Sequence, residues 1–296
     1  MFKDEFEPTI FANMKKAFIL ILSIWSITSW AQKVEGYKIF SSNGKKSSFE
    51  KMLKASDSNE VILFGELHDN PISHWLQLEL TNSMLKNNKL VLGAEMIEAD
   101  NQDELNQYLD GTIDEDGLDS TARLWVNHKT DYQPLVDFAK ENELHFVATN
   151  IPRRYAKMVY RGGFESLDTL SAEEKSWIAT LPPAYDSELP GYKAMLEMMG
   201  GHGGENFPKA QAIKDATMAH FIIENMESDH TFIHYHGTYH SNNYEGIMWY
   251  LQQIDPEMKI TTIATVSQAD VSKLMDENKS IADFIICVDE DMTTTH

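Results

Sequence analysis

The stretch VILFGELHDN, residues 61–70, joins a run of apolar residues directly to a run of polar ones. Val61–Phe64 has no alternation of apolar and polar residues, which is typical of a strand covered on both faces of a parallel sheet. Glu66 and His68 follow almost at once. In open parallel sheets, ligands bind beyond the carboxyl ends of the strands. The stretch therefore predicts a buried parallel strand that ends in a functional site.

On either side of this stretch, short apolar runs rich in β-branched residues alternate with longer segments of helical period. The expected strands are Val61–Phe64, Leu90–Ala94, His145–Thr149, Thr231–Tyr235, Ile260–Val266 and Phe284–Val288. The expected helices are Pro71–Lys86, Gln102–Leu109, Pro134–Asn142, Pro152–Arg161, Ala172–Ala179, Pro208–Met226 and Asn243–Gln252. This order predicts an α/β fold with a mainly parallel sheet flanked by helices. The segment 162–204, rich in Gly and Pro, is expected to form a helical insertion or lid over the sheet.

Composition and charge narrow the classes of partner. The chain has 296 residues, 42% of them hydrophobic, which is enough for a sizeable core. It carries 46 acidic residues against 25 basic ones, a net charge of −21. Such a surface repels nucleic acid and anionic lipid, so neither is expected as a partner. No long linker or repeat follows residue 36, and we expect residues 32–296 to form a single domain.

The first 31 residues predict export. Lys15 and Lys16 precede an apolar run at 17–27 and then small residues, a pattern typical of a secretory signal peptide with cleavage before Gln32. The apolar run is too short to span a bilayer comfortably, so no transmembrane segment is expected once the signal is removed.

Met14 is interpreted as the true start of the chain, because the thirteen residues before it carry acids where a signal peptide has bases. The single cysteine, Cys287, lies far from the cleavage site. Neither an internal disulfide nor a lipid attached at a lipobox cysteine is therefore expected. We expect a periplasmic or secreted protein.

Polar side chains follow four of the expected strands. In chain order they are Glu66 and His68, Glu95, Arg153 and Arg154, and His240 in the stretch HYHGTYH. Two carboxylates and two imidazoles form a mixed nitrogen and oxygen set that suits zinc, manganese or iron. A carboxylate near a metal can also act as a general base for an attacking water. The arginines can bind an anionic group of a substrate.

Each of these residues also has a structural interpretation. Glu66 could cap the following helix, although a cap is better placed at the residues just before Pro71. A lone buried carboxylate is costly, which favours a role in a site for Glu95. Arg153 and Arg154 open a helix, where the macrodipole disfavours cations. Either an anionic partner or an internal ion pair with nearby acids would account for that placement.

Several short motifs, in a fixed order, resemble the ChaN-like family of the haem-binding uptake and Tiki superfamily. They are GELHDN (65–70), EM (95–96), DNQDELNQYLDG (100–111), Trp125 with DYQPLVDFA (131–139), ATNIPRR (148–154), KAQAIKDATMA (209–219) and HGTYH (236–240). The resemblance covers about residues 45–267. It implies an α/β fold with the family's Glu, His and Glu positions, at Glu66, His68 and Glu95, along one edge of the sheet. The family's glycine–histidine motif falls on Gly237 and His240.

The resemblance also implies a cofactor. Characterised ChaN-like proteins are exported and bind haem, with dimerisation around it, so haem and a homodimer are expected. Tyrosine and histidine are suitable axial ligands, and the candidates here are His202, Tyr132 and Tyr239. Gln211 and Asp215 match a helical segment of the family and share one face of that helix.

The leading interpretation is an exported haem-binding protein of haem or iron acquisition. The alternative is a metal-dependent hydrolase, a Tiki-like protease or esterase, in which Glu66, His68, Glu95 and His240 hold the metal or activate water. A third is a binding protein for another anionic small molecule, held by Arg153 and Arg154.

Overall fold

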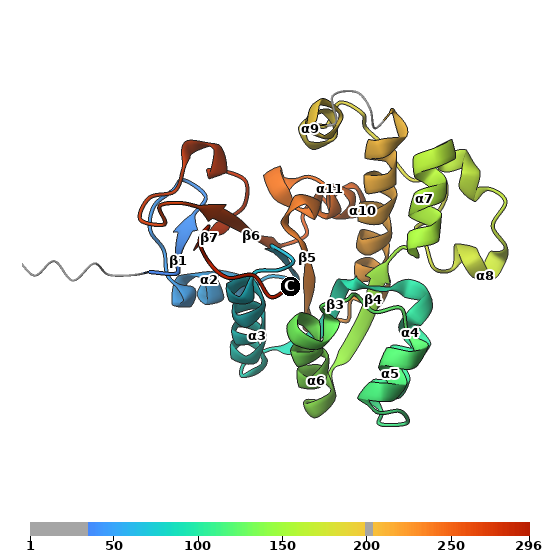
Figure 1. The fold of residues 1–296 in the computed structure, drawn as a ribbon, viewed down its shortest axis with the longest axis horizontal. Coiled ribbons are helices and arrows are strands. Elements are labelled where there is room, and N and C mark those ends of the chain that lie inside the picture. The colour runs from blue at the N-terminus through green and yellow to red at the C-terminus, as the bar shows by residue number, and fades with distance from the viewer. Residues whose placement is uncertain (1–34, 199–203) are drawn as a thin grey trace, which may run out of the picture. The chain divides into compact units, whose positions relative to one another are not determined.

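A seven-stranded sheet forms the centre of the molecule, and all but one of its neighbouring strand pairs are parallel (Figure 1). The computed structural model describes residues 35–198 and 204–296. The strands are β1 Tyr37–Ser41, β2 Val61–Glu66, β3 Lys89–Glu98, β4 His145–Asn150, β5 His230–Gly237, β6 Ile260–Gln268 and β7 Phe284–Asp289. They lie in the order β1-β7-β6-β2-β5-β3-β4, with β1 antiparallel to β7. The predicted α/β fold with a mainly parallel sheet is confirmed.

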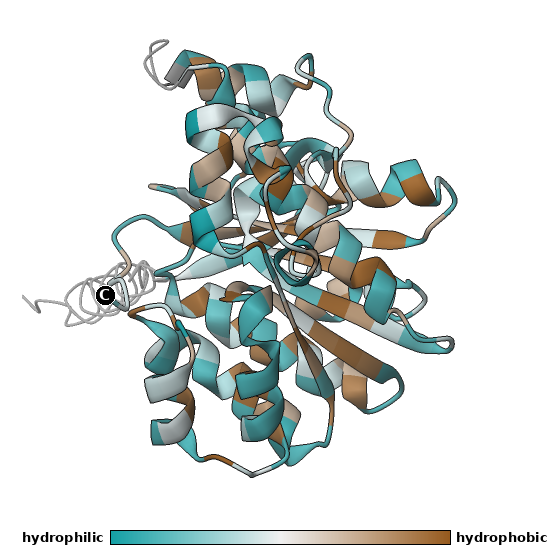
Figure 2. Ribbon diagram, turned by 90° about the vertical axis from the view of Figure 1, so that its right-hand side faces the viewer, coloured by the Kyte–Doolittle hydropathy of each residue, from teal (hydrophilic) through white to brown (hydrophobic). Residues whose placement is uncertain are grey.

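Helices cover both faces of this sheet (Figures 1 and 2). They are α2 Phe49–Ser56, α3 Pro71–Leu85, α4 Gln102–Leu109, α5 Glu115–Thr121, α6 Gln133–Glu141, α7 Arg153–Gly162, α8 Ala172–Lys175, α9 Pro190–Met198, α10 Asn206–Asn225 and α11 Ile247–Ile254. Within the described ranges, no helix is long and apolar enough to cross a membrane.

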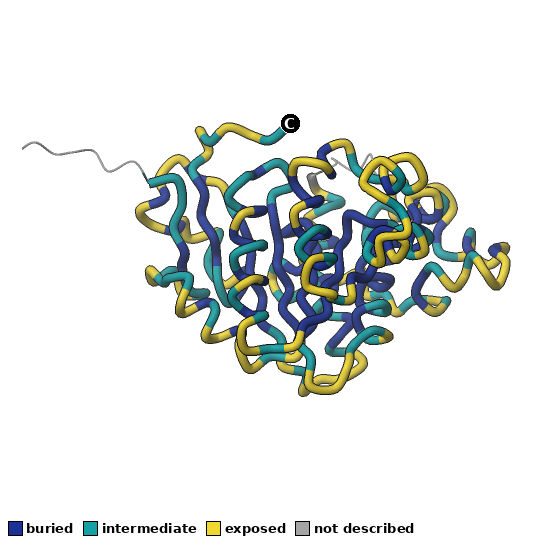
Figure 3. Tube along the Cα trace, turned by 90° about the horizontal axis from the view of Figure 1, so that it is seen from below, coloured by how far each residue is buried: buried dark blue, intermediate teal, exposed yellow. Residues whose placement is uncertain are grey.

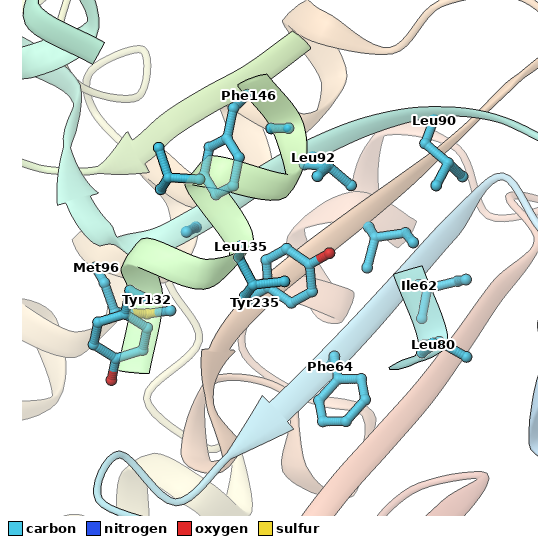
Figure 4. Close-up of a cluster of buried hydrophobic side chains, with 14 of the residues drawn as sticks. Ile62, Phe64, Leu80, Leu90, Leu92, Met96, Tyr132, Leu135, Phe146 and Tyr235 are labelled. Atoms are coloured by element: carbon cyan, nitrogen blue, oxygen red, sulfur yellow. The ribbon is translucent and has the colours of Figure 1, made fainter. Parts of the chain in front are cut away.

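The strand β2 shows why the sheet is buried on both faces. All six of its residues are buried, and it lies between the parallel strands β5 and β6. Successive side chains point to opposite faces. Ile62 and Phe64 join a core with α3 and α6, part of which Figure 4 shows. Val61 and Leu63 join a second core with α7, α10 and α11. Figure 3 shows the buried strands between more exposed helices.

The loop after β2 turns directly into α3. The side chain of Asn70 accepts hydrogen bonds from the backbone N–H groups of Ile72 and Ser73, at 3.0 and 3.1 Å. Pro71 occupies the first turn, where its missing N–H costs nothing. Since Asn70 caps α3, Glu66 is free of that structural role.

The structure differs from the sequence prediction at several elements. The strand β1 and the helices α2 and α5 were not predicted. The helix expected at 172–179 ends at Lys175, and the one expected from Asn243 begins at Ile247. Asn243 and Tyr244 have φ angles of 60° and 61°, in the left-handed region that does not continue a helix. The expected insertion at 162–204 contains α8 and α9. The predicted signal peptide at 1–31 lies outside the described residues.

The strand order determines where a site can form. β5 lies between β2 and β3, so the carboxyl ends of these three strands meet at one edge. β2 and β3 are consecutive in the chain, whereas β5, which lies between them in the sheet, begins only at His230. Polar residues that are far apart in the sequence are thereby brought together.

Candidate functional site

A cleft of about 1050 Å³ opens at the carboxyl edge of the sheet. This volume is at the upper end of the roughly 300–1,000 Å³ typical of small-molecule and cofactor sites. Its walls come from the segment 123–127, the junction of β4 with α7, the helices α9 and α10, and the segment 237–246. Among the residues that line it are His68, Glu95, Arg153, Arg154, Tyr239 and His240.

The first polar group of the site is the pair formed by Glu66 and His68. His68 Nδ1 lies 2.9 Å from Glu66 Oε1, and the glutamate is buried while the imidazole side chain is 43% exposed. The ring of Trp125 packs edge-on against His68, with centroids 4.9 Å apart. Because Glu66 engages Nδ1 and Trp125 supports the ring, the orientation of His68 is fixed from two sides.

Several side chains besides His68 also hold the carboxylate of Glu66. Tyr132 donates its hydroxyl hydrogen to Oε1 at 2.7 Å, and Gln77 donates from its amide to Oε2 at 2.7 Å. His74 Nδ1 lies 3.3 Å from the same Oε2. Burial would raise the pKa of Glu66, but hydrogen bonds from His68 and His74 outweigh it and lower this pKa. Glu66 is therefore a buried carboxylate that stays ionised.

A second acid–imidazole group lies deeper in the cleft, around His240. Its Nε2 lies 3.0 Å from Glu95 Oε1, and its Nδ1 forms a short contact with Asp215. Glu95 also accepts a hydrogen bond of 2.8 Å from the backbone N–H of Gly237. All three side chains are at least nine-tenths buried. Both ring nitrogens of His240 are thus occupied by carboxylates.

The charges of this inner group are set by its own members. Burial disfavours the charged imidazole, but Glu95 and Asp215 outweigh burial and raise the pKa of His240 to about 9. Burial would raise the pKa of Glu95, yet the positive His240 holds it well below its usual range. Burial raises the pKa of Asp215, and His240 only partly offsets this. At neutral pH the group is best described as a protonated imidazole between two acids that share its charge.

The predicted metal ligands therefore separate into two groups. Glu66 pairs with His68, and Glu95 pairs with His240. Over residues 35–198 and 204–296, no three His, Cys, Asp or Glu side chains are gathered in a way that could hold a metal ion. The four residues meet at one edge of the sheet as two neighbouring carboxylate–imidazole pairs, with His68 Nε2 and Glu95 Oε2 both facing Gly237.

The two arginines that open α7 have different surroundings. Arg154 donates to Asp100 Oδ2 at 2.6 Å and to the hydroxyl of Tyr155 at 3.0 Å, so its charge is used in an internal ion pair. Arg123 forms ion pairs with the same Asp100 and with Glu98. Arg153 lines the cleft and is exposed, and its guanidinium has no partner in the part of the chain that the structure describes.

The three candidate haem ligands fall in three different places. Tyr239 is 76% exposed at the mouth of the cleft. Tyr132 is 2% exposed and lies beside the hydrophobic core (Figure 4). It is not among the residues that line the cleft, and its hydroxyl is hydrogen-bonded to Glu66. His202 lies outside the described residues. Tyr239 is therefore accessible to a ligand in the cleft, whereas the hydroxyl of Tyr132 holds the carboxylate of Glu66.

The sequence analysis did not identify the buried residues of α3 that hold Glu66 in place. His74 and Gln77 are three apart on α3, fully or nearly buried, and both reach Glu66. The signal was two polar side chains on the buried face of a helix that follows directly after a site motif. Lys214, which also lines the cleft from α10, was missed as well, because a lone lysine on a helix gives no signal of its own.

The three histidines at the end of β5, His234, His236 and His240, are all buried. His236 is buried, with Nε2 lying 2.8 Å from the hydroxyl of Ser241 and Nδ1 lying 3.0 Å from His234 Nδ1. Burial lowers the pKa of His236 to about 3. His236 is therefore neutral and internal, and of the three histidines of this strand end, His234, His236 and His240, only His240 lines the cleft.

Comparison with known proteins gives one family and several similar structures. The family model described as "Haem-binding uptake, Tiki superfamily, ChaN" matches residues 52–251. A solved structure described as "Cofacial heme binding to ChaN of Campylobacter jejuni" is 19% identical and covers 84% of this chain and 96% of its own, with a TM-score of 0.64. A protein from Bacillus cereus is 11% identical, with a TM-score of 0.50 and coverage of 86% and 95%. At these identities the structural likeness shows the fold alone.

A curated plant protein is also similar in sequence. Protein RETICULATA-RELATED 5, chloroplastic, from Arabidopsis thaliana, is 26% identical over 200 residues, which are 61% of this chain. The chain spans about a quarter of the length of that relative, 26%.

Proposed function

This chain belongs to the haem-binding uptake, Tiki superfamily, ChaN family, and from that membership we propose that it is an exported protein that binds haem for haem or iron acquisition. One observation supports this most strongly. A large cleft has an exposed tyrosine, Tyr239, at its mouth, beside an apolar wall. Export is supported by the signal-like pattern at residues 14–31 of the sequence.

The cleft fits a flat, largely apolar cofactor. Leu124, Trp125 and Val126 form one wall, and Val126 is 95% exposed. Exposing so much apolar surface at a cleft mouth is costly in water unless a ligand or partner covers it. Met195 and Phe207 contribute further apolar surface from α9 and α10. Cofactor sites have this composition, with few polar groups on mainly apolar walls.

Tyr239 is the residue that we propose to hold the iron. Phenolate oxygen is an established haem ligand type, and this side chain is accessible. Haem would supply a redox-active iron, while the chain's own residues bind and orient the ring and exclude water from it. Tyr132 is not proposed as a ligand, because its hydroxyl is bonded to Glu66.

A homodimer around the cofactor forms part of this proposal. Val126 and Tyr239 both line the cleft and are both exposed, and a second copy placed over the cleft would cover them. The phrase "cofacial heme binding" in the description of the Campylobacter jejuni protein is consistent with such an arrangement. Size-exclusion chromatography of the full chain with and without haemin tests this directly.

The test of haem binding is a spectroscopic titration. Haemin is added to the purified full chain, and the absorbance spectrum is recorded at each step. A saturable Soret shift with defined stoichiometry is expected. A featureless titration that does not saturate would overturn the proposal and favour the hydrolase.

A hydrolase is a second candidate, favoured by the orientation of His68. Glu66 engages Nδ1, so Nε2 is free to take a proton from a water molecule in the cleft. This pairing of a buried carboxylate with a half-exposed imidazole is the arrangement of a general base. In the metal-dependent form of this proposal, Glu66, His68, Glu95 and His240 would hold the metal or activate the water.

The variants that separate the two candidates are Glu66→Ala and His68→Ala. If haem binding alone is the function, both variants still give the Soret shift and neither changes any ester or peptide hydrolysis. Loss of a hydrolytic activity or of metal uptake in both variants, with haemin binding intact, would establish a separate catalytic site.

A further inference from the structure

The cleft carries two basic side chains that are not held in an ion pair within the part of the chain that the structure describes. Four arginine and lysine side chains line it: Arg123, Arg153, Arg154 and Lys214. Arg123 and Arg154 are paired with Asp100, and Arg123 also with Glu98. Arg153 and Lys214 form no ion pair or side-chain hydrogen bond within residues 35–198 and 204–296. Of the four cations, these two are therefore the ones available to a ligand.

The packing of α7 against α10 brings Arg153 and Lys214 to the same cleft. The helices α7 and α10 pack side by side (Figure 1), and the ring of Tyr160 meets that of Phe207 edge-on at 6.3 Å. Arg153 lies seven residues before Tyr160, and Lys214 lies seven residues after Phe207. Seven residues are about two helical turns. Counted in opposite directions along the two packed helices from the Tyr160–Phe207 contact, this spacing accounts for the fact that both basic side chains line the cleft.

The charges that face this wall leave it able to attract anions. Four carboxylates line the same cleft, Glu95, Glu98, Asp215 and Glu245, and Lys214 helps to lower the pKa of Glu95. Glu95 and Asp215 already hold His240, whose positive charge they share, while Glu98 pairs with Arg123 and Glu245 accepts a hydrogen bond from the backbone N–H of Gly191. On a chain with a net charge of −21, an anionic ligand is repelled by most of the surface. A local pair of cations is what such a ligand needs in order to enter.

We propose that Arg153 and Lys214 form a carboxylate-binding subsite, which selects ligands that combine a flat apolar body with carboxylate groups. This rests on the proposed haem function and deepens it. The apolar segment 124–126 takes the ring, and the two cations, from α7 and α10, take its carboxylates by charge-assisted hydrogen bonds. Recognition by these cations is independent of the iron ligand.

The test uses a porphyrin without iron, so that Tyr239 contributes no metal bond. Protoporphyrin IX and its dimethyl ester, which has lost both carboxylates, are titrated separately into the full chain, and porphyrin fluorescence is followed. We expect the free acid to bind about tenfold more tightly than the ester. Its affinity should weaken as salt is raised, while that of the ester should not.

Substitutions then locate the effect. Arg153→Gln and Lys214→Gln should each weaken binding of the free acid by about three- to tenfold, and neither should change binding of the ester. Arg161→Gln is the matched control, because Arg161 is exposed on the same helix and does not line the cleft. It should bind both porphyrins as the unaltered chain does.

The outcomes separate this inference from the proposed function. Equal binding of acid and ester, together with a normal haemin titration, would overturn the subsite and leave haem binding intact. Equal loss of both porphyrins in Arg153→Gln or Lys214→Gln would mean that these residues are structural, and would also overturn it. Failure of the unaltered chain to bind haemin or either porphyrin would overturn both proposals.

Discussion

The two carboxylate–imidazole groups at the edge of the sheet use the same residue types but differ in their access to water. In the outer group, the side chain of His68 is 43% exposed and one of its ring nitrogens faces the cleft. In the inner group, the side chain of His240 is 7% exposed and both ring nitrogens face carboxylates. The comparison indicates that the role of each imidazole depends on its burial and on how many of its ring nitrogens are already bound by carboxylates. The outer group is available for binding or proton transfer, and the inner group stabilises the wall of the cleft.

The largest expected effect comes from breaking the inner group. Glu95→Ala removes one of the two partners of a buried imidazolium and leaves the backbone N–H of Gly237 without its acceptor. Breaking a buried ion pair from one side costs about 3–5 kcal/mol in the free energy of unfolding. Urea unfolding measures this loss.

Glu95→Gln is the matched control, because it keeps the size of the side chain and an oxygen that can accept from Gly237. We expect it to lose less stability than Glu95→Ala. A loss below about 1 kcal/mol in Glu95→Ala would show that the inner group does not stabilise the wall, and would contradict the comparison.

A smaller effect on the free energy of unfolding is expected when a rise in pH deprotonates His240. The pKa of His240 is about 9 in the folded protein, above its ordinary value of about 6.5 in the unfolded chain. A group with a raised pKa adds stability that is fully present below its unfolded pKa and is lost as pH rises through the folded one. The free energy of unfolding should therefore decrease between about pH 6.5 and 9, by an amount of the order of 1–3 kcal/mol.

Urea unfolding at pH 6.5 and pH 9.5 tests this, with His240→Gln as the comparison. The variant should be the less stable of the two at pH 6.5, and the difference should shrink at pH 9.5. An equal difference at both pH values would mean that the protonated form of His240 is not the one that stabilises the fold.

The smallest effect on stability is expected in the outer group. His68→Ala removes one of several donors to Glu66, while Tyr132 and Gln77 still hold that carboxylate. A half-exposed side chain contributes little, so the free energy of unfolding should change by less than about 1 kcal/mol. A loss comparable to that of Glu95→Ala would erase the distinction between the two groups.

The sequence was sufficient for the parts of the fold that are encoded locally. The run Val61–Phe64 ends abruptly at polar residues, which predicts both the buried strand and the place of Glu66 and His68. The short strand β1 was missed, because its stability comes from pairing with β7, about 250 residues away. Helix periodicity likewise could not predict where α11 begins, since residues with left-handed φ angles delay it.

The contacts that give each site residue its role could not be predicted, because they join distant segments. Arg154 pairs with Asp100, 54 residues earlier, whereas Arg153 beside it has no such partner in the described ranges. The position of both at a helix start left an ion pair and an anionic ligand equally open. The inner group likewise forms only when α10 brings Asp215 to His240.

The central claim is that ligand binding belongs to the exposed mouth of the cleft and the buried groups support it. Its most direct test is a haemin titration of Tyr239→Phe beside Tyr132→Phe, which removes the hydroxyl of a buried tyrosine instead of an exposed one. We predict that Tyr239→Phe loses the Soret shift of the unaltered chain, whereas Tyr132→Phe keeps it. A normal titration in Tyr239→Phe, or loss of the shift in Tyr132→Phe alone, would contradict this account.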